Sequence, residues 1–350
     1  MGSSRTLWGC EIMSPTDQVR IMFVGDISLG EYYTAFGHGP KTYAEHSNIF
    51  SGVQSILNQA DIVAGNLETP ITDHGYKPNL VETAVLRGNP KHAHQLTEAG
   101  FKVLQVSNNH SIQHGIQGFE ETISILKNLG ITPVGLQGQE LTKLSKGSQK
   151  LGFLAASDVL DNTDVAQNCY QRLDEEFCNR IEASVKEVDH LFIMLHWGLE
   201  AHTKPMKYQR DLINKMANIG VRGIIGQHPH LFYPVWLEDN RTIAAPSLGN
   251  FVFDLFWDER LLKSAILDIK LTSSGLGECN IWPITLCRNS GRPIACGSPT
   301  IVDKEINLYK LGDNMNGEQS RKLKCFLKDY FKGNSALKAQ FIAKKILGKI

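Results

Sequence analysis

Two histidines separated by one residue follow an apolar segment and could together bind a metal ion. His228 and His230 close the sequence Gly-Gln-His-Pro-His, which comes directly after the apolar run 221–225. In an extended backbone, residues two apart point to the same side, and Pro229 favours an extended conformation for the residue before it. Because imidazole nitrogens are common ligands of divalent metals, the pattern predicts that both rings point into one metal site.

Further side chains of the kinds that bind metals come directly after other apolar segments. These candidate ligands are Asp26, Asn66, Glu68, Asn109 and His196. Each one taken alone has an ordinary explanation, such as a turn or a buried histidine with a hydrogen-bonding partner. Open α/β sheets, however, place their ligand sites outside the carboxyl ends of the strands, where residues distant in sequence meet. The recurrence of oxygen and nitrogen donors at this position predicts a single site for divalent metal ions.

The remaining histidines near such segments carry different expectations. His110 follows Asn109 and would face the same edge of the sheet, where an imidazole beside a metal is a candidate general acid. His92 and His94 repeat the one-residue spacing, but they fall in a segment with helical periodicity. Residues two apart diverge on a helix, so we expect this second pair to belong to an ordinary surface helix.

Apolar segments that alternate with amphipathic ones would bring the candidate ligands to one edge. Strands are expected at 19–24, 61–68, 101–106, 131–134, 151–155, 190–195, 221–225, 242–245, 247–253 and 264–271. Helices are expected at 48–59, 90–100, 119–129, 173–188 and 206–219. The alternation predicts an α/β fold, and the strand-rich final part suggests a two-sheet sandwich. At 350 residues, the chain suits one large domain at 19–303, with an N-terminal extension at 1–18 and a C-terminal extension at 304–350.

Charge, cysteine and hydropathy patterns narrow the class of protein. The 36 basic and 36 acidic residues balance, so the overall charge does not point to nucleic acid. Seven scattered cysteines without a CxxC motif predict reduced, mostly buried thiols. No apolar run has the length of a membrane span and no signal-peptide pattern is visible, which favours a cytoplasmic protein. Residues 1–6 fit a myristoylation pattern, but we favour the interpretation that residues 1–12 precede the native fold.

The last fifty residues differ in character from the rest. Residues 301–350 hold eleven Lys and Arg against five Asp and Glu, with two helices expected at 321–332 and 336–350. We expect these helices to dock through their apolar side chains, which are Leu323, Phe326, Leu327, Phe341, Ile342 and Ile346. The alternative is a weak contact of the basic tail with an anionic membrane or polymer.

Six short sequence blocks, taken in order, resemble the bacterial capsule-synthesis CapA family. The blocks are Gly25-Asp26, Asn66–Pro70, Asn108–His110, His196–Glu200, Gly226–His230 and Ser247–Phe251. That family is associated with poly-γ-glutamate and capsule production and belongs to the calcineurin-like metallophosphoesterase superfamily. The resemblance covers about residues 19–254. An ordered set of this kind is highly specific for the family and much less specific for a reaction.

The resemblance implies a two-sheet α/β/β/α sandwich and two metal ions that share an activated water. By position, Asp26 and His230 would hold the first ion, and Glu68 or Asn66 would stand between the two ions. The second ion would have the ligands Asn109, His196 and His228. His110 would protonate the leaving group. Side chains expected to orient the ligands or to contact substrate are Asn108, Glu200 and Asn250. Manganese, iron or zinc would suit such ligands.

Three positions depart from the pattern that the resemblance implies. Ser28 stands where typical phosphoesterases have a histidine, and Asn66 stands where they have a bridging aspartate. Gln113 stands where the capsule family commonly has an aspartate. We therefore expect one firmly bound metal ion and a second that is weak or depends on substrate.

These observations favour a metal-dependent hydrolase or transferase linked to capsule or exopolymer biosynthesis. Its substrate would be a phosphoester or an anionic polymer with γ-glutamyl amide linkages. The alternative is a non-catalytic metal-binding accessory protein that works with the subunits of a polymer synthase. Nucleotide-binding glycine motifs, a GxSxG elbow and a recognisable nucleic-acid module are all absent from the sequence, so these classes are not expected.

Overall fold

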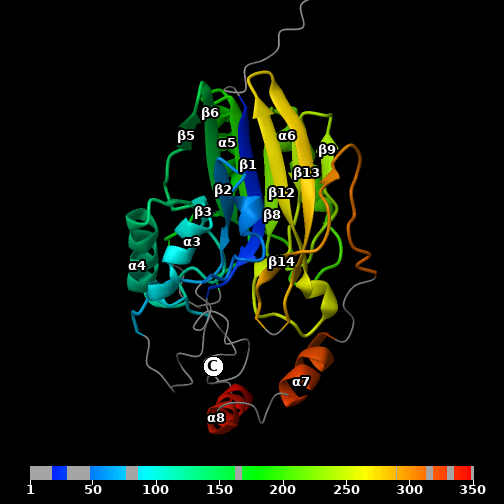
Figure 1. Cartoon of the computed structure of the whole chain (residues 1–350). Helices are drawn as coiled ribbons and strands as arrows, with labels where there is room; N and C mark the ends of the chain where they lie inside the picture. Colours follow the sequence, from blue (N-terminus) through cyan, green and yellow to red (C-terminus); the bar gives the residue numbers. More distant parts are fainter. Residues whose placement is uncertain are drawn as a thin grey trace, which may run out of the picture.

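Two β-sheets lie face to face with helices on both outer faces (Figure 1). The computed structural model describes residues 18–29, 48–75, 86–161, 168–288, 290–312, 318–328 and 335–347. The predicted α/β class and the α/β/β/α sandwich are confirmed.

The first sheet has nine strands and carries the amino-terminal strand in its middle. Its main path runs β14-β13-β12-β1-β2-β3-β4, while β11 pairs with β1 and β15 pairs with β13. The strands are β1 (Val19–Ile27), β2 (Ile62–Leu67), β3 (Phe101–Gln105), β4 (Thr132–Val134), β11 (Asn250–Val252), β12 (Lys263–Thr272), β13 (Gly275–Leu286), β14 (Pro293–Ala295) and β15 (Thr300–Ile301). Strands β1 to β4 run parallel, so their carboxyl ends lie at one edge.

The second sheet has six strands in the order β5-β6-β7-β8-β10-β9. The strands are β5 (Thr142–Lys146), β6 (Gln149–Ser157), β7 (His190–His196), β8 (Gly223–Gln227), β9 (Trp236–Glu238) and β10 (Thr242–Ala245). Neighbours β6, β7 and β8 are parallel, so β7 and β8 deliver His196 and the Gly-Gln-His-Pro-His segment to one edge of this sheet.

Alternation along the strands separates the inner core from the two outer cores. In β1, Phe23 faces the core between the sheets, while Met22 packs under the helices of the first sheet. The rings of Phe23 and Phe153 each contact Phe192 in the inner core, with centroids 5.1 and 5.8 Å apart. Burying each such ring contributes about 1.5–3 kcal/mol, so these contacts hold the two sheets together.

Helices cover the two outer faces. The first sheet is covered by α2 (Gln54–Leu57), η4 (Pro90–His92), α3 (His94–Glu98) and α4 (Gly115–Asn128). The second sheet is covered by α5 (Glu175–Ser184) and α6 (Lys207–Asn218). The helix expected at 48–59 is shortened to the single turn α2. The twelve-residue strand β13 was not expected, because Glu278, Asn280 and Pro283 interrupt its apolar pattern.

The segment before the C-terminal helices packs on the sandwich. Ile306 forms a β-bridge with Val235, and the Tyr309 hydroxyl donates to the backbone oxygens of Ser264 and Ile284. Leu311 is buried against the short 3₁₀ helix η5 (Glu259–Leu262). The packed part of the chain therefore continues beyond residue 303, and the predicted domain boundary stays a prediction.

Helices α7 (Glu318–Lys328) and α8 (Ser335–Ile346) lie beyond the lower end of the sheets (Figure 1). The expectation that Leu323, Leu327 and Ile346 dock these helices is wrong, because their exposed fractions are 57%, 56% and 79%. Ile342 is half-buried, and the side chains of Phe326 and Phe341 lie outside the described residues. No helix in the described part of the chain is long and apolar enough to cross a membrane.

The cysteines are free thiols where the structure describes them, as expected. The expectation that most are buried is wrong. Of the five described thiols, Cys279 alone is buried; Cys296 is exposed and the others are half-buried. Residues 1–17, including the myristoylation pattern, lie outside the described residues.

Candidate metal centre

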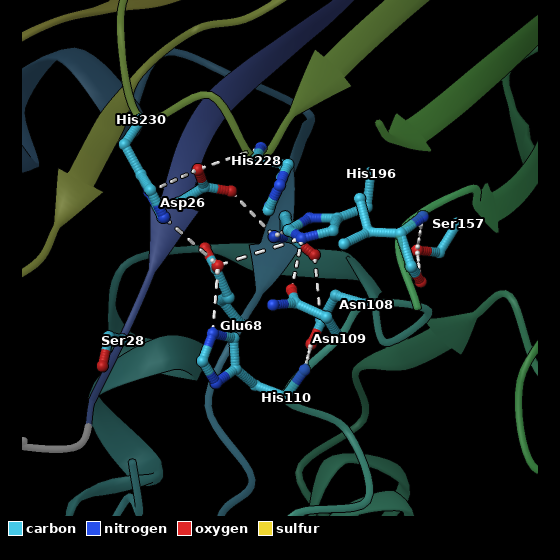
Figure 2. Close-up of polar contacts among 12 residues, drawn as sticks. Asp26, Ser28, Glu68, Asn108, Asn109, His110, Ser157, His196, His228 and His230 are labelled. Atoms are coloured by element: carbon cyan, nitrogen blue, oxygen red, sulfur yellow. Dashed lines mark hydrogen bonds and ion pairs between the residues drawn. The ribbon is translucent and has the colours of Figure 1, made fainter. Parts of the chain in front are cut away.

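The candidate ligands meet where strands of both sheets end (Figure 2). Asp26 lies near the end of β1, and Glu68 and Asn109 follow β2 and β3. His196 ends β7, and the pair His228 and His230 follows β8. All of these side chains are buried. The structure thus brings together residues from five separate segments at one edge, as the strand-end pattern predicts.

The ligand atoms form two groups of three that share one carboxylate. Glu68, His196 and His228 offer atoms that all lie within 4.8 Å of one another, and so do Asp26, Glu68 and His230. Oxygen Oε1 of Glu68 lies 3.9 Å from His196 Nε2 and 3.6 Å from His230 Nε2. A carboxylate between two such groups has the position of a bridging ligand.

Within the described part of the chain, no hydrogen bond to the Glu68 carboxylate compensates its burial. Both carboxylate oxygens are buried and accept no hydrogen bond from the described residues. Burial, together with the charge of Asp26, raises the pKa of Glu68 well above its ordinary value. A buried carboxylate that accepts no hydrogen bond from the described residues is costly, and a bound cation is one way to satisfy it. The buried Nδ1 of His228 also has no hydrogen-bond partner among the described residues. The donor set therefore fits a divalent metal.

The protonation of the histidines follows their surroundings. Burial lowers the pKa of His228 to about 4 and lowers that of His196 well below its ordinary value. Both rings are thus neutral near pH 7, which is the form that binds metals. Burial alone would also lower the pKa of His230, but the carboxylates of Glu68 and Asp26 raise it to about 10. The imidazolium of His230 supplies the positive charge that a metal ion would otherwise bring to these carboxylates.

Asn66 orients other side chains instead of offering its oxygen to the centre. Its amide nitrogen donates to Asp26 Oδ1 at 2.8 Å and lies 3.3 Å from His196 Nδ1. Its oxygen accepts from the Asn108 amide at 3.2 Å, and the same amide donates to the backbone oxygen of Leu67. Of the two residues considered for a position between two metal ions, Glu68 belongs to both groups of candidate ligands, whereas the amide of Asn66 is used in the hydrogen bonds above.

Asn109 and Asn250 each contact one histidine of the centre. Oxygen Oδ1 of Asn109 lies 2.8 Å from His196 Nε2. Oxygen Oδ1 of Asn250 lies 2.8 Å from His230 Nδ1, and its amide donates to the backbone oxygen of Leu261. The Asn250 contact leaves Nε2 of His230 directed at Glu68, so Asn250 sets the orientation of that ring.

The extended conformation expected for the histidine pair is wrong. Strand β8 ends at Gln227, and His228 and His230 have positive φ angles of 94° and 59°. The rings converge because a tight turn, not strand alternation, directs them. The backbone N–H of His228 donates to Asp26 Oδ2 at 3.3 Å, which ties this turn to β1. Left-handed backbone at two non-glycine residues is strained, and such strain gathers at functional sites.

His110 lies beside the shared carboxylate. Its Nε2 is 3.8 Å from Glu68 Oε1, and its backbone N–H donates to Asn108 Oδ1 at 3.1 Å. Burial lowers the pKa of His110 to about 4, while a side-chain hydrogen bond with Gln113 opposes this shift. The ring therefore reaches the centre from the side of β3, next to the candidate ligands.

The second histidine pair and Ser28 were also singled out in the sequence, and neither adds a ligand to the centre. His94 is exposed and its Nδ1 contacts the backbone oxygen of Lys91, which confirms that the second histidine pair is ordinary surface structure. Ser28 is buried and accepts a hydrogen bond from Thr69 at 2.6 Å. In Figure 2, Ser28 lies apart from the cluster of carboxylates and histidines.

Comparison with known proteins places this arrangement in a family. Residues 20–255 match the family model for the bacterial capsule synthesis protein PGA_cap. The chain belongs to the PGA_cap family. It is 29% identical over 294 residues to the PGA biosynthesis protein CapA of Bacillus subtilis strain 168, covering 79% of this chain and 74% of that protein. It is 25% identical over 295 residues to the capsule biosynthesis protein CapA of Bacillus anthracis, covering 79% and 70%.

One side chain beside the exposed Glu200 lies outside the part that matches the PGA_cap model. Lys322, on α7, places its Nζ 3.1 Å from Glu200 Oε1 and 5.0 Å from the centre of the Trp257 ring. Glu200 was expected near the site, but Lys322 and Trp257 were not. No spacing or motif in the sequence distinguishes Lys322 from its neighbours, because only the docking of α7 brings it to the rim.

Proposed function

We propose that this PGA_cap protein is a metal-dependent hydrolase or transferase that acts on an anionic polymer or its precursor during capsule or exopolymer biosynthesis. The observation that carries the proposal is the position of Glu68, which belongs to both groups of candidate ligands. Its buried oxygens accept no hydrogen bond from the residues that the structure describes. Such a carboxylate fits a pair of divalent ions better than it fits a purely structural role.

In this proposal, Asp26, Glu68 and His230 hold one ion. Glu68, His196 and His228 hold the other, with Asn109 as an additional oxygen ligand. The mixture of carboxylate, amide and imidazole ligands suits manganese, iron or zinc. When bound, divalent ions activate water and stabilise negative charge on the reacting group.

The protein's own side chains orient the centre and transfer a proton. Asn66 and Asn250 hold Asp26 and His230 in place through the hydrogen bonds described above. His110 lies 3.8 Å from Glu68 Oε1, close enough to the centre to give a proton to a leaving oxygen or nitrogen. Because burial lowers its pKa to about 4 in the metal-free protein, His110 would act as the general acid only after taking up a proton, which a bound substrate anion would favour. The exposed Glu200 lies at the rim, where substrate would enter.

The substrate class follows from family membership together with this chemistry. The relatives from Bacillus are named for PGA and capsule biosynthesis. A phosphoester or a γ-glutamyl amide linkage would suit a centre that combines divalent ions with a proton donor. Subunits of a polymer synthase are the protein partners that such a role implies.

A second candidate is a non-catalytic metal-binding accessory protein of a polymer assembly complex. It is favoured by the position of Asn66, whose nitrogen faces Asp26 at 2.8 Å where the superfamily would have a ligand oxygen. Ser28 likewise faces Thr69 and adds no ligand to the group around Asp26. A centre with one strong and one weak ion site could bind polymer without cleaving it.

Elemental analysis and turnover assays on the same variants separate these candidates. We expect the purified protein to contain manganese, iron or zinc and to hydrolyse a generic phosphodiester or a γ-glutamyl substrate. His228→Ala should lose both metal and turnover, whereas His110→Ala should keep the metal and lose turnover. His94→Ala, a substitution at the exposed surface, is the matched control. Folded protein without metal would refute both candidates, and metal without turnover on any substrate would favour the accessory role.

A further inference from the structure

A lysine from the C-terminal helix α7 reaches the rim of the metal centre. Lys322 Nζ lies 3.1 Å from Glu200 Oε1 and 5.0 Å from the centre of the Trp257 ring. Next to it, Arg321 pairs with Asp258 at 2.6 Å, and Arg260 also binds Asp258. These contacts anchor one turn of α7 to the loop that follows β11.

Glu200 connects this contact to the centre itself. It follows His196 by four residues, and the neighbouring N–H of Ala201 donates to the backbone oxygen of Pro229 at 3.0 Å. The loop that carries Glu200 is thereby tied to the turn that carries His228 and His230. Three histidines of the site also sense its charge. Burial is the largest influence on the pKa values of His110, His228 and His230, and the charge of Glu200 raises each of these pKa values.

The carboxylate of Glu200 creates a problem for an anionic substrate. In the proposed function the bound ions, and without them the imidazolium of His230, compensate the buried Asp26 and Glu68, whereas the exposed Glu200 lies outside these groups. A phosphate or carboxylate group that enters past Glu200 would be repelled unless a cation lies beside it. Lys322 is a described cation in contact with Glu200, and Arg321 already pairs with Asp258.

We propose that Lys322 is a specificity-determining residue that binds the anionic group of the substrate at the rim of the metal centre. This inference rests on the proposed function for the identity of the substrate. The side chains of Lys322 and Glu200 are 40% and 43% exposed, and exposed ion pairs are weak. A substrate anion can therefore replace Glu200 as the partner of the ammonium group, while the face of Trp257 keeps the lysine in position.

Lys322 lies outside the part of the chain that the family shares. The match to the family model ends at residue 255, and Lys322 lies well beyond it. Helix α7 would thus complete the substrate site from outside the shared domain. Differences in this C-terminal segment would change which anion is accepted while leaving the metal ligands untouched.

Binding of inorganic phosphate to the full-length protein tests this inference. Titration calorimetry would compare the wild-type protein with Lys322→Met, Glu200→Gln and the control Lys324→Met, each with and without Mn²⁺. Lys324 is exposed on the same helix. We expect Lys322→Met to weaken phosphate binding about tenfold, as for the loss of one hydrogen bond to a charged group. Glu200→Gln should bind phosphate at least as tightly as wild type, because the competing carboxylate is gone, and Lys324→Met should change affinity less than twofold.

Four results would overturn the role of Lys322. The first three are no phosphate binding by the wild-type protein, an unchanged affinity in Lys322→Met, and an equal loss in Lys324→Met. A loss of affinity in Glu200→Gln would show that the ion pair is merely structural, which also overturns it. The proposed function fails separately: protein that takes up no Mn²⁺ yet binds phosphate through Lys322 would refute the metal centre and retain this inference.

Discussion

The Nε2 atom of His196 lies 2.8 Å from the amide oxygen of Asn109, although 87 residues separate the two in sequence. One residue ends β7 of the second sheet and the other follows β3 of the first. Their contact exists because the two sheets pack face to face with these strand ends at a common edge. The centre therefore spans the sandwich, and its geometry depends on the packing between the sheets as much as on the ligands.

Glu68→Gln should stabilise the metal-free protein and abolish its response to metal. The substitution removes a buried carboxylate that accepts no hydrogen bond from the described residues and lies beside the charge of Asp26, while Asp26 remains as the partner of His230 at 3.2 Å. We therefore expect the free energy of unfolding to rise by about 1–3 kcal/mol. Urea denaturation after chelation measures this change. Mn²⁺ should raise the midpoint for wild type and for the exposed control Glu98→Gln, but not for Glu68→Gln. A variant that keeps the full Mn²⁺ response would exclude Glu68 as the shared ligand.

Asn66→Asp should increase the number of bound metal ions at a cost in metal-free stability. The new carboxylate would lose the hydrogen bond to Asp26 and face that carboxylate at about the same distance, which is 2.8 Å now. We expect a loss of about 2–3 kcal/mol without metal. Calorimetric titration with Mn²⁺ should show tighter binding of the ion that Asp26, Glu68 and His230 would hold. Unchanged stoichiometry and affinity would mean that Asn66 does not limit binding of this ion.

Gly226→Ala should destabilise the fold strongly. A Cβ atom at this position would lie 1.8 Å from the backbone oxygen of Pro246 and 2.4 Å from Trp197 Nε1. Neither group can move freely, because the Trp197 indole donates to that same oxygen at 2.9 Å. We expect a loss of about 3 kcal/mol in urea denaturation. At Gly297, where the nearest atom would be 3.7 Å away, alanine should change stability little. Equal effects at the two positions would contradict this account.

His190 should make the protein less stable as the pH falls. Burial and the nearby charge of Arg222 lower the pKa of His190 to about 4; Arg222 Nε donates to Nδ1, and Nε2 contacts Gln149 Oε1. Below the ordinary pKa of 6.5 the unfolded chain takes up a proton that the folded protein does not, so stability present above pH 6.5 is lost between pH 6.5 and 4.

By pH 5 this single group should cost about 2 kcal/mol of stability, from about 1.4 kcal/mol for each pH unit below 6.5. The measurement compares urea denaturation of chelated wild type and His190→Gln at pH 7 and pH 5. The other buried histidines affect both proteins equally, so the difference isolates His190. The variant should lose less stability on acidification than either wild type or the control His94→Gln. An identical loss in all three proteins would rule out the contribution of His190.

Local chemistry along the chain was enough to predict the fold class and the identity of most residues at the centre. Apolar runs that alternate with amphipathic segments reflect burial on one or both faces, and burial is a property that each segment shows on its own. Asp26, His196 and His228 stood out because polar residues seldom follow such runs by chance at matching positions. Strand β13 was not predicted from its apolar pattern, because half of its residues are exposed or only half-buried.

Packing decided the features that no local pattern contains. The backbone at His228 and His230 is left-handed. Contacts with residues distant in sequence impose this conformation, because the end of β8 passes close to Pro246 and the N–H of His228 bonds to Asp26. The choice of Glu68 over Asn66 depends on a hydrogen bond to another strand. Lys322 reaches Glu200 across 122 residues. Such contacts form only when separate elements pack against each other. Their interaction energy depends on both packed surfaces, so neither segment of the sequence predicts it alone.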